Sequence, residues 1–281
     1  MAKKVSIINM KGGVGKSTLC INFAWHFAAM VKWLKKVLVV DLDPQFNASQ
    51  YLLGVTAYNN IITNNIPTIW DIFEQFTQLP GIPRPSSLNP SDILYRARTF
   101  HGGGIIDLIP SRLELAFSLR NPGQKDQLLE KFVSQIENNY DMILLDCPPT
   151  ESLFTWAAYL TSDYILVPVK PEYLSSIGLP LLVNSMQEFG RRYEGNQLGL
   201  AGIVFNATSG YVPEEITAKN EVRQIAQQNG WYVFSNEVSY SRSYPKGARE
   251  GQPIFRTSYS RSDQCARFRT VAEEFAQRIG L

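Results

Sequence analysis

The sequence predicts an α/β protein with a mostly parallel, twisted sheet and helices on both faces. Residues 5–9 form a short apolar run that stops at a glycine-rich turn, and residues 16–32 repeat apolar side chains at helical spacing. Residues 37–40 are apolar, mostly β-branched and too short for a helix. A strand, a helix and a strand within about 40 residues make a βαβ unit, which places parallel strands in one sheet.

The same alternation returns later in the chain. Further strands are predicted at residues 105–109, 142–146, 164–169, 200–205 and 231–234. Helices are predicted at about 124–138, 151–160, 176–190, 214–228 and 263–279. Strands that alternate with helices along the chain again favour a parallel sheet covered on both faces.

Residues 54–104 interrupt this rhythm. They contain two Asn-Asn pairs, five prolines and three consecutive glycines at 102–104, and only residues 68–76 and 91–98 have helical character. Their apolar residues are too few for an independent core. We therefore expect an elaborated surface connection within a single domain that spans residues 1–281.

Composition excludes several classes of protein. The chain has 281 residues, of which 44% are hydrophobic and 19% charged, which is typical of a folded globular protein. Its net charge of +2 does not by itself indicate nucleic-acid binding. Three widely spaced cysteines favour a reducing cytoplasm over a disulfide framework. The N-terminal residues do not form a signal peptide, and no apolar stretch approaches the ~20 residues that span a bilayer.

The turn after the first strand carries the most informative motif. It reads Lys11-Gly12-Gly13-Val14-Gly15-Lys16-Ser17-Thr18. The common pattern G-x-x-x-x-G-K-[ST] requires glycine where this chain has Met10, and a second lysine, Lys11, precedes the double glycine. Glycines let the backbone turn its N–H groups toward a polyphosphate, and the N-terminus of the next helix adds positive charge there. The motif therefore predicts a phosphate-binding loop, or P-loop.

Polar side chains around this loop complete a predicted nucleotide site. Lys16 is expected to reach the β- and γ-phosphates of a nucleotide, and the Ser17 hydroxyl to bind Mg²⁺. Asp41, Asp43 and Asp146 stand at the ends of predicted strands. Because parallel strands bring their carboxyl ends to one edge of the sheet, all three carboxylates can face the loop. Strand-end aspartates that cap the next helix are the alternative interpretation.

Four motifs together resemble the ParA/MinD family of deviant Walker A ATPases, and the ParA partition branch most closely. The first is Lys11-Gly-Gly-Val-Gly-Lys16-Ser-Thr with its additional lysine. The second and third are Asp41-Leu-Asp43-Pro-Gln45 and Leu145-Asp146-Cys-Pro-Pro149. The fourth is Val167-Pro-Val-Lys-Pro-Glu-Tyr173 followed by Ile177-Gly-Leu179. They occur in the family's order over nearly the whole chain, and residues 54–104 match least.

The resemblance implies an ATP-sandwich homodimer that hydrolyses ATP with Mg²⁺. Lys11 would contact the phosphates in the partner subunit, and with Lys16 and Asp43 it would make up the catalytic set. Asp43 would position or polarise the attacking water, while Asp41 would support the Mg²⁺ held by Ser17 and Asp146. Asn206 occupies the place of an adenine-recognising asparagine, although a turn-forming asparagine explains it nearly as well.

Basic residues concentrate between positions 242 and 269. Seven of them stand against two acidic residues, with tyrosines interleaved: Arg242, Lys246, Arg249, Arg256, Arg261, Arg267 and Arg269. Basic side chains on loops suit phosphate contacts that carry no sequence information. This agrees with the non-specific DNA binding that the ParA resemblance implies, and a solvated basic face is the alternative.

The resemblance also implies an adaptor protein that stimulates ATP hydrolysis, and a cargo such as a plasmid, a chromosome or a protein assembly like the carboxysome. A prokaryotic cytoplasmic location on the nucleoid would follow. The competing class is a MinD-like ATPase that docks on membranes through the last helix, but the stripe from Phe268 to Ile279 is explained by packing onto the sheet. A small-molecule kinase or ligase built on the same loop stays open.

Overall fold

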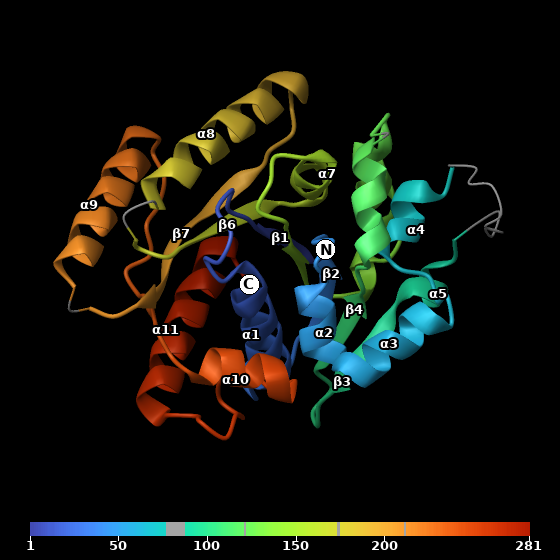
Figure 1. Cartoon of the computed structure of the whole chain (residues 1–281), viewed down its shortest axis with the longest axis horizontal. Helices are drawn as coiled ribbons and strands as arrows, with labels where there is room; N and C mark the ends of the chain where they lie inside the picture. The colour runs from blue at the N-terminus through green and yellow to red at the C-terminus, as the bar shows by residue number, and fades with distance from the viewer. Residues whose placement is uncertain (77–87, 121, 173–174, 211) are drawn as a thin grey trace.

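The computed structural model describes residues 1–76, 88–120, 122–172, 175–210 and 212–281, and it contains one eight-stranded sheet (Figure 1). The strand order is β3-β4-β2-β5-β1-β6-β7-β8, and every pair is parallel except β3 with β4. The strands are β1 (Lys3–Ile7), β2 (Lys36–Asp41), β3 (Tyr95–Thr99), β4 (Ile105–Ile109), β5 (Met142–Asp146), β6 (Tyr164–Val169), β7 (Gly199–Thr208) and β8 (Val238–Ser239).

Helices cover both faces of this sheet, which confirms the predicted fold class. The α-helices are α1 (Lys16–Ala29), α2 (Asn47–Leu53), α3 (Val55–Thr63), α4 (Ile69–Glu74), α5 (Pro90–Ile93), α6 (Leu128–Val133), α7 (Leu153–Thr161), α8 (Ser175–Arg192), α9 (Pro213–Gln228), α10 (Ser243–Glu250) and α11 (Ser262–Ile279). Short 3₁₀ helices are η1 (Leu113–Arg120), η2 (Lys125–Gln127) and η3 (Glu137–Asn139).

The central strands are buried on both faces because each face has its own core. Alternate residues of β5 divide between them: Ile143 and Leu145 join the core under α4, α6, α7 and α8, whereas Leu144 joins the core under α1 and α11. In the second core the ring of Phe23 on α1 lies 4.9 Å from that of Phe275 on α11. Helix α1, which follows the P-loop, thus packs between the sheet and α11.

The last helix keeps its apolar stripe inside the protein. Phe268, Val271, Ala272, Phe275 and Ile279 are all buried in the core that α11 shares with α1. Each large apolar side chain buried in this way contributes about 1.5–3 kcal/mol to folding. Packing onto the sheet side therefore accounts for the stripe, as the sequence predicted. Among the described residues, none of the helices combines the length and apolarity of a membrane span.

The predicted helix at 91–98 is mostly wrong. Only Pro90–Ile93 is helical, and Tyr95–Thr99 forms β3, which pairs antiparallel with β4 at the sheet edge. An ion pair between Arg96 and Asp107 fastens the two strands. An available sheet edge overrides weak local helical preference. Residues 77–87 of the 54–104 connection lie outside the described residues.

Three further predictions need correction. Residues 231–234 do not form a strand: Val233 makes a single bridge to Ile203, and the last strand is β8. Residues 124–138 break into η2, α6 and the start of η3. Residues 245–247 contain Pro245 and Gly247 and suggest a turn within the basic segment, but they form part of helix α10, since proline is tolerated in a first turn, where the N–H groups have no intrahelical partner.

Candidate functional site

A cleft of about 390 Å³ opens at the carboxyl edge of the sheet, between the P-loop and the loop after β2. Gly12, Gly13 and residues 15–18 line one side of it, and Asp43 and Gln45 line the other. Strand register explains this meeting, because Asp146 at the end of β5 is paired with Ile7 of β1 and with Asp41 of β2. The structure therefore brings the predicted P-loop and all three predicted carboxylates to one edge, as the parallel sheet requires.

The P-loop adopts a backbone that glycine permits. Gly13 and Gly15 have φ of 74° and 92°, in the left-handed region that residues with a side chain rarely enter. A Cβ atom at Gly15 would also lie 2.1 Å from Nδ2 of Asn206. The loop then passes into α1 at Lys16, so its N–H groups and the helix N-terminus face the same cleft.

Lys16 is buried beneath the loop. Its Nζ donates hydrogen bonds to the backbone oxygens of Asn9 at 3.2 Å and Lys11 at 3.1 Å. Burial lowers the pKa of Lys16, while the charge of Asp146 opposes that shift. The ammonium group thus lies among groups that a bound phosphate could replace as hydrogen-bond partners.

The carboxylate of Asp41 is fully engaged by the chain. Its Oδ2 accepts hydrogen bonds from the N–H of Ser49 at 2.8 Å and from the Ser49 hydroxyl at 2.7 Å, and its Oδ1 accepts one from the N–H of Asp43 at 3.1 Å. Burial raises the pKa of Asp41 to about 7, against the lowering effect of the Ser49 bonds. This arrangement favours support of the neighbouring loop over direct metal ligation.

Asp146 presents the opposite situation. Both oxygens are buried and receive no well-formed hydrogen bond within the described part of the chain, although the Ser17 hydroxyl lies near enough to favour the charged form. Burial, followed by the charge of Asp41, raises its pKa well above the ordinary value. A buried carboxylate without partners beside a hydroxyl fits a Mg²⁺ site. No cage of three or more His, Cys, Asp or Glu exists among the described residues, so the ion would need phosphate and water ligands too.

Lys11 directly precedes the glycines of the P-loop. Its Nζ lies 3.4 Å from Oε2 of Glu172, and its side chain is partly exposed. The N–H of Lys11 is held by Oδ1 of Asn9 at 2.9 Å, and Nδ2 of Asn9 donates to the oxygen of Pro168 at 2.8 Å. Sequence reasoning missed Asn9, although a polar residue at the end of an apolar strand was the available signal.

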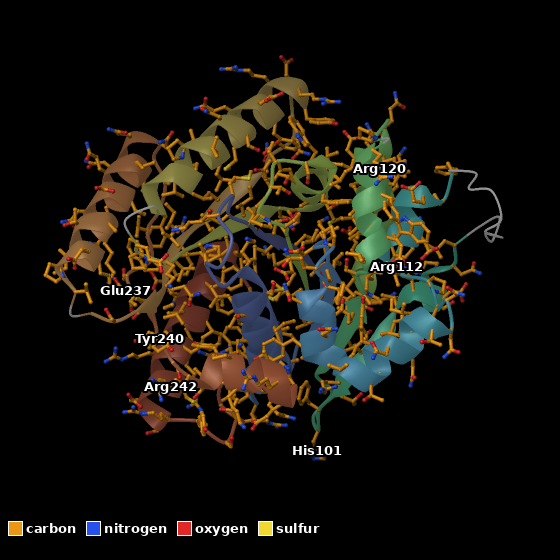
Figure 2. All side chains as sticks on the ribbon, viewed as in Figure 1. His101, Arg112, Arg120, Glu237, Tyr240 and Arg242 are labelled. Carbon is orange, nitrogen blue, oxygen red and sulfur yellow. The ribbon has the colours of Figure 1, made fainter. Side chains whose placement is uncertain are left out.

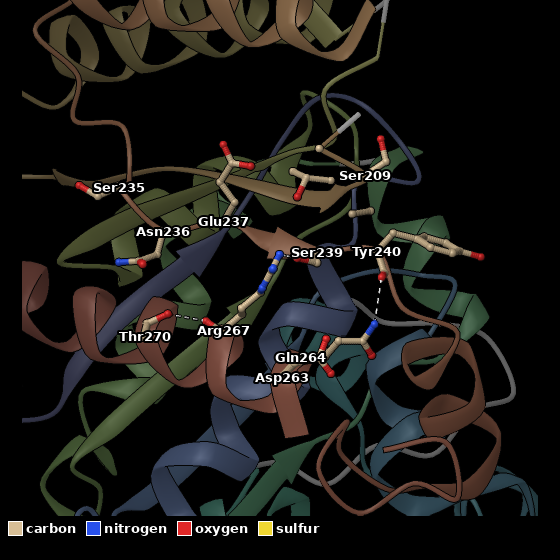
Figure 3. Close-up of a pocket in the computed structure, with 13 residues that line it drawn as sticks. Ser209, Ser235, Asn236, Glu237, Ser239, Tyr240, Asp263, Gln264, Arg267 and Thr270 are labelled. Atoms are coloured by element: carbon tan, nitrogen blue, oxygen red, sulfur yellow. Dashed lines mark hydrogen bonds between the residues drawn. The ribbon is translucent and has the colours of Figure 1, made fainter. Parts of the chain in front are cut away.

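Asn206 reaches the P-loop from the far end of the chain. Its Nδ2 donates to the backbone oxygen of Val14 at 2.7 Å, and the next residue, Ala207, has a left-handed φ of 56°. Ala207 also lines a larger cavity, about 840 Å³, which opens between the ends of β7 and β8 and helix α11 (Figure 3). Figure 3 shows Arg267 directed toward Ser239 in this cavity, where its guanidinium donates to the Ser239 hydroxyl at 2.9 Å.

The residues of the basic segment have different local surroundings. Arg242 and Arg261 line a hollow of about 500 Å³ together with Tyr240 and Tyr259; Figure 2 shows Tyr240 and Arg242 at the edge of the molecule. Lys246 lies over the ring of Tyr259 at 5.4 Å. The guanidinium of Arg256 instead lies 5.4 Å from the ring centre of Trp25, on α1. Arg249 and Arg269 are exposed.

Helix α10 connects this segment to the cleft. Ala248 lines the cleft, and the hydroxyl of Tyr51 on α2 donates to the oxygen of Gln252 at 3.0 Å, just after α10. Gly247 allows this approach, because a Cβ atom there would lie 2.4 Å from that oxygen and 2.8 Å from the Tyr51 hydroxyl. The sequence held no signal for this contact, since the residues lie about 200 positions apart.

Comparisons with known proteins give the family of the chain and relatives of similar sequence. Residues 2–198 match the family model described as an AAA domain. The chromosome-partitioning ATPase Soj of Treponema pallidum is 26% identical over an alignment of 283 residues that covers 100% of this chain and 99% of Soj.

Two solved structures share the fold over nearly their whole length. Apo McdA of Cyanothece gives a TM-score of 0.78 at 18% identity, covering 98% of this chain and 99% of McdA. A putative plasmid partition protein from Borrelia burgdorferi B31 bound to AMPPNP gives 0.73 at 20% identity, covering 99% and 98%.

Proposed function

The chain belongs to the AAA-domain family and is a P-loop ATPase of the ParA/MinD type, and on that premise we propose that it is a partition or positioning ATPase. In this proposal it hydrolyses ATP with Mg²⁺, forms an ATP-sandwich homodimer and binds DNA non-specifically. The observation that carries the proposal is a P-loop that contains both Lys11 and Lys16, with the buried Lys16 close to the carboxylate of Asp146.

The site residues divide the work of ATP binding between them. The N–H groups from Gly12 to Thr18 would hold the phosphate oxygens, and Lys16 would exchange its backbone partners for the β- and γ-phosphates. Ser17 and Asp146 would hold Mg²⁺, which neutralises the charge that develops during phosphoryl transfer. The side-chain amide of Asn206 would exchange its hydrogen bond to the backbone oxygen of Val14 for one to the edge of the adenine.

Hydrolysis requires a positioned water. The carboxylate of Asp43 lines the cleft, and only its Oδ1 accepts a bond described in the structure, from the N–H of Gln45 at 2.9 Å. Its other oxygen would orient the attacking water toward the γ-phosphate. Asp41 would keep this loop in place through the N–H of Asp43.

Dimerisation would use Lys11. Lys16 already serves the nucleotide in its own subunit, and the Nζ of Lys11 is paired only loosely, at 3.4 Å from Glu172. Lys11 could therefore leave this partner for the phosphates of a second subunit, where a cation stabilises the charge of the transition state. Dimer formation would then depend on ATP.

DNA binding would centre on the hollow that contains Arg242 and Arg261, with Lys246 beside it. Arg249, Arg256, Arg267 and Arg269 would add charge around it. Such contacts read phosphates and not bases, so a dimer would bind duplexes of any sequence on the nucleoid. An adaptor bound to cargo would then stimulate hydrolysis and release the dimer.

The testing experiment combines phosphate release with size-exclusion chromatography and light scattering. The parent protein should release phosphate from ATP only with Mg²⁺, and it should elute as a dimer with a non-hydrolysable ATP analogue and as a monomer with ADP. Lys11→Ala should bind ATP within a few-fold of the parent but stay monomeric. A Lys11→Ala protein that dimerises like the parent would overturn the sandwich arrangement.

A further inference from the structure

We propose that Ser49 and Tyr58 are positioning residues for Asp43, because both fasten its loop to the backbone of Ser111. The inference rests on the proposed role of Asp43 in ATP hydrolysis. Ser49 lies on α2 and Tyr58 on α3, whereas Ser111 follows β4, the strand that pairs with β2.

The conformation of the Asp43 loop depends first on Asp41. Oδ1 of Asp41 accepts the N–H of Asp43 at 3.1 Å, and the backbone oxygen of Asp43 accepts the N–H of Phe46 at 2.8 Å. These bonds close a tight turn between β2 and α2. Where the carboxylate of Asp41 lies therefore determines where the backbone of Asp43 lies.

Ser49 fixes that carboxylate. Both its N–H and its hydroxyl donate to Oδ2 of Asp41, and its Oγ accepts the N–H of Ser111 at 2.9 Å. A hydroxyl has one proton to donate, which goes to Asp41, and the bond from Ser111 uses a lone pair. Ser49, Ser111 and Asp41 are fully buried, so water cannot replace a bond that is lost.

Phe46 and Tyr58 fix the other end of the turn. Phe46 has a left-handed φ of 47°, a conformation that costs energy for a residue with a side chain and persists only when its surroundings impose it. Its ring stacks on Tyr58, with ring centres 4.9 Å apart. The hydroxyl of Tyr58 donates to the oxygen of Ser111 at 3.1 Å. The N–H and the oxygen of Ser111 thus anchor the two ends of one turn.

Neither anchor residue is among the described residues that line the cleft, whereas Asp43 is. Ser49 and Tyr58 would therefore act on a bound nucleotide indirectly, through the loop and the start of α2 that they hold. Small displacements of a reacting group cost up to about a hundredfold in rate. Loss of either anchor should accordingly lower kcat and leave ATP affinity nearly unchanged.

The first test compares Ser49→Ala with Ser118→Ala, which removes another buried hydroxyl, one in η1 that donates to Glu74 on α4. Ser49→Ala should lower kcat about tenfold, with the Kd for a fluorescent ATP analogue within twofold of the parent. Ser49→Thr keeps a hydroxyl and should recover most of the rate, while Ser118→Ala should match the parent. Parent-like kcat in Ser49→Ala, or loss of ATP affinity equal to its loss of kcat, would overturn the inference.

A second test needs no catalysis. Tyr58→Phe keeps the stacked ring and removes the bond to Ser111, and Tyr159→Phe, which loses a bond to Ser185, is its control. Hydrogen exchange in residues 41–50 should accelerate in Ser49→Ala and Tyr58→Phe and stay at the parent rate in both controls. Unchanged exchange in both anchor variants would overturn the inference. Parent-like hydrolysis in Asp43→Ala would instead overturn the proposed role of Asp43.

Discussion

The P-loop and the basic segment at 242–269 are organised in opposite ways. The P-loop takes its functional groups from eight consecutive residues. Hydrogen bonds donated by Lys16 and Asn206, and one accepted by Asn9 from the N–H of Lys11, hold it. The basic segment takes its charge from 28 residues that the fold distributes: Arg242 and Arg261 line one hollow, and Arg256 lies against Trp25 on α1. A motif of adjacent residues therefore identifies the residues of a site. A count of charged residues identifies only the segment of the chain in which a site could lie.

The largest effect should come from the P-loop itself. Lys16→Ala removes the buried cation, and with it two or more charge-assisted bonds to phosphate of about 1.5–3 kcal/mol each. ATP affinity should fall by about 10²–10⁴-fold, measured by titration calorimetry. Lys32→Ala, which removes an exposed lysine paired with Glu273, is the control and should bind like the parent. Affinity within a few-fold of the parent in Lys16→Ala would contradict the placement of the nucleotide.

Asp43→Ala should separate hydrolysis from binding. The phosphate-binding loop stays intact, but the carboxylate that orients water is removed, so kcat should fall by about 10²–10⁴-fold. Phosphate release measures this decrease, and chromatography with ATP should show the variant accumulating as a dimer. A monomeric, nucleotide-free Asp43→Ala protein would refute the assignment.

His26 lies in the core between α1, which follows the P-loop, and α11, which contains the end of the basic segment. Its titration tests how this core contributes to stability. His26 lies buried between α1 and α11, neither ring nitrogen has a hydrogen-bond partner among the described residues, and burial, with the charge of Arg269, lowers its pKa from 6.5 to about 4. Below pH 6.5 His26 binds a proton in the unfolded chain but stays neutral in the folded protein. The free energy of unfolding therefore keeps its full value above this pH and decreases as the pH falls toward 4.

The expected loss is about 2 kcal/mol between pH 7.5 and pH 5. Urea unfolding of the parent and of His26→Leu at both pH values measures it, because the other titrating groups contribute equally to both proteins. The parent should lose about 2 kcal/mol more than the variant over this interval. Equal losses would show that His26 does not stay neutral in the folded state.

DNA affinity should show the smallest change. It also distinguishes most directly which residues of the basic segment contact DNA. Arg242→Ala with Arg261→Ala should weaken binding to two unrelated duplexes alike, by about tenfold, and flatten the log–log salt dependence by about 0.9 for each phosphate that is no longer neutralised. Arg256→Ala should flatten that slope less than the double variant, since its guanidinium lies over Trp25 on α1. Fluorescence anisotropy with ATP, ADP and no nucleotide provides the measurement, and equal affinity in all three states would refute a dimer-gated interaction.

Local sequence predicted the regular part of the fold well. The strands at 105–109, 142–146 and 164–169 were predicted with their observed bounds, because their side chains are mostly apolar and mostly buried. Helix α10 was missed, since Pro245 and Gly247 are turn signals in isolation. β3 was missed because the sheet edge that it joins lies outside its own sequence.

The sequence by itself determined the P-loop, its place between a strand and a helix, and the carboxylates of Asp41, Asp43 and Asp146 at strand ends. These depend on neighbouring residues and on the rule that parallel strands share one edge. Only the tertiary structure decided that Asp41 is fully bonded while Asp146 is not, that Asn206 holds Val14, and that Ser111 anchors the Asp43 loop. Hydrogen bonding of buried groups depends on which distant segments the sheet brings together, and no local pattern records that.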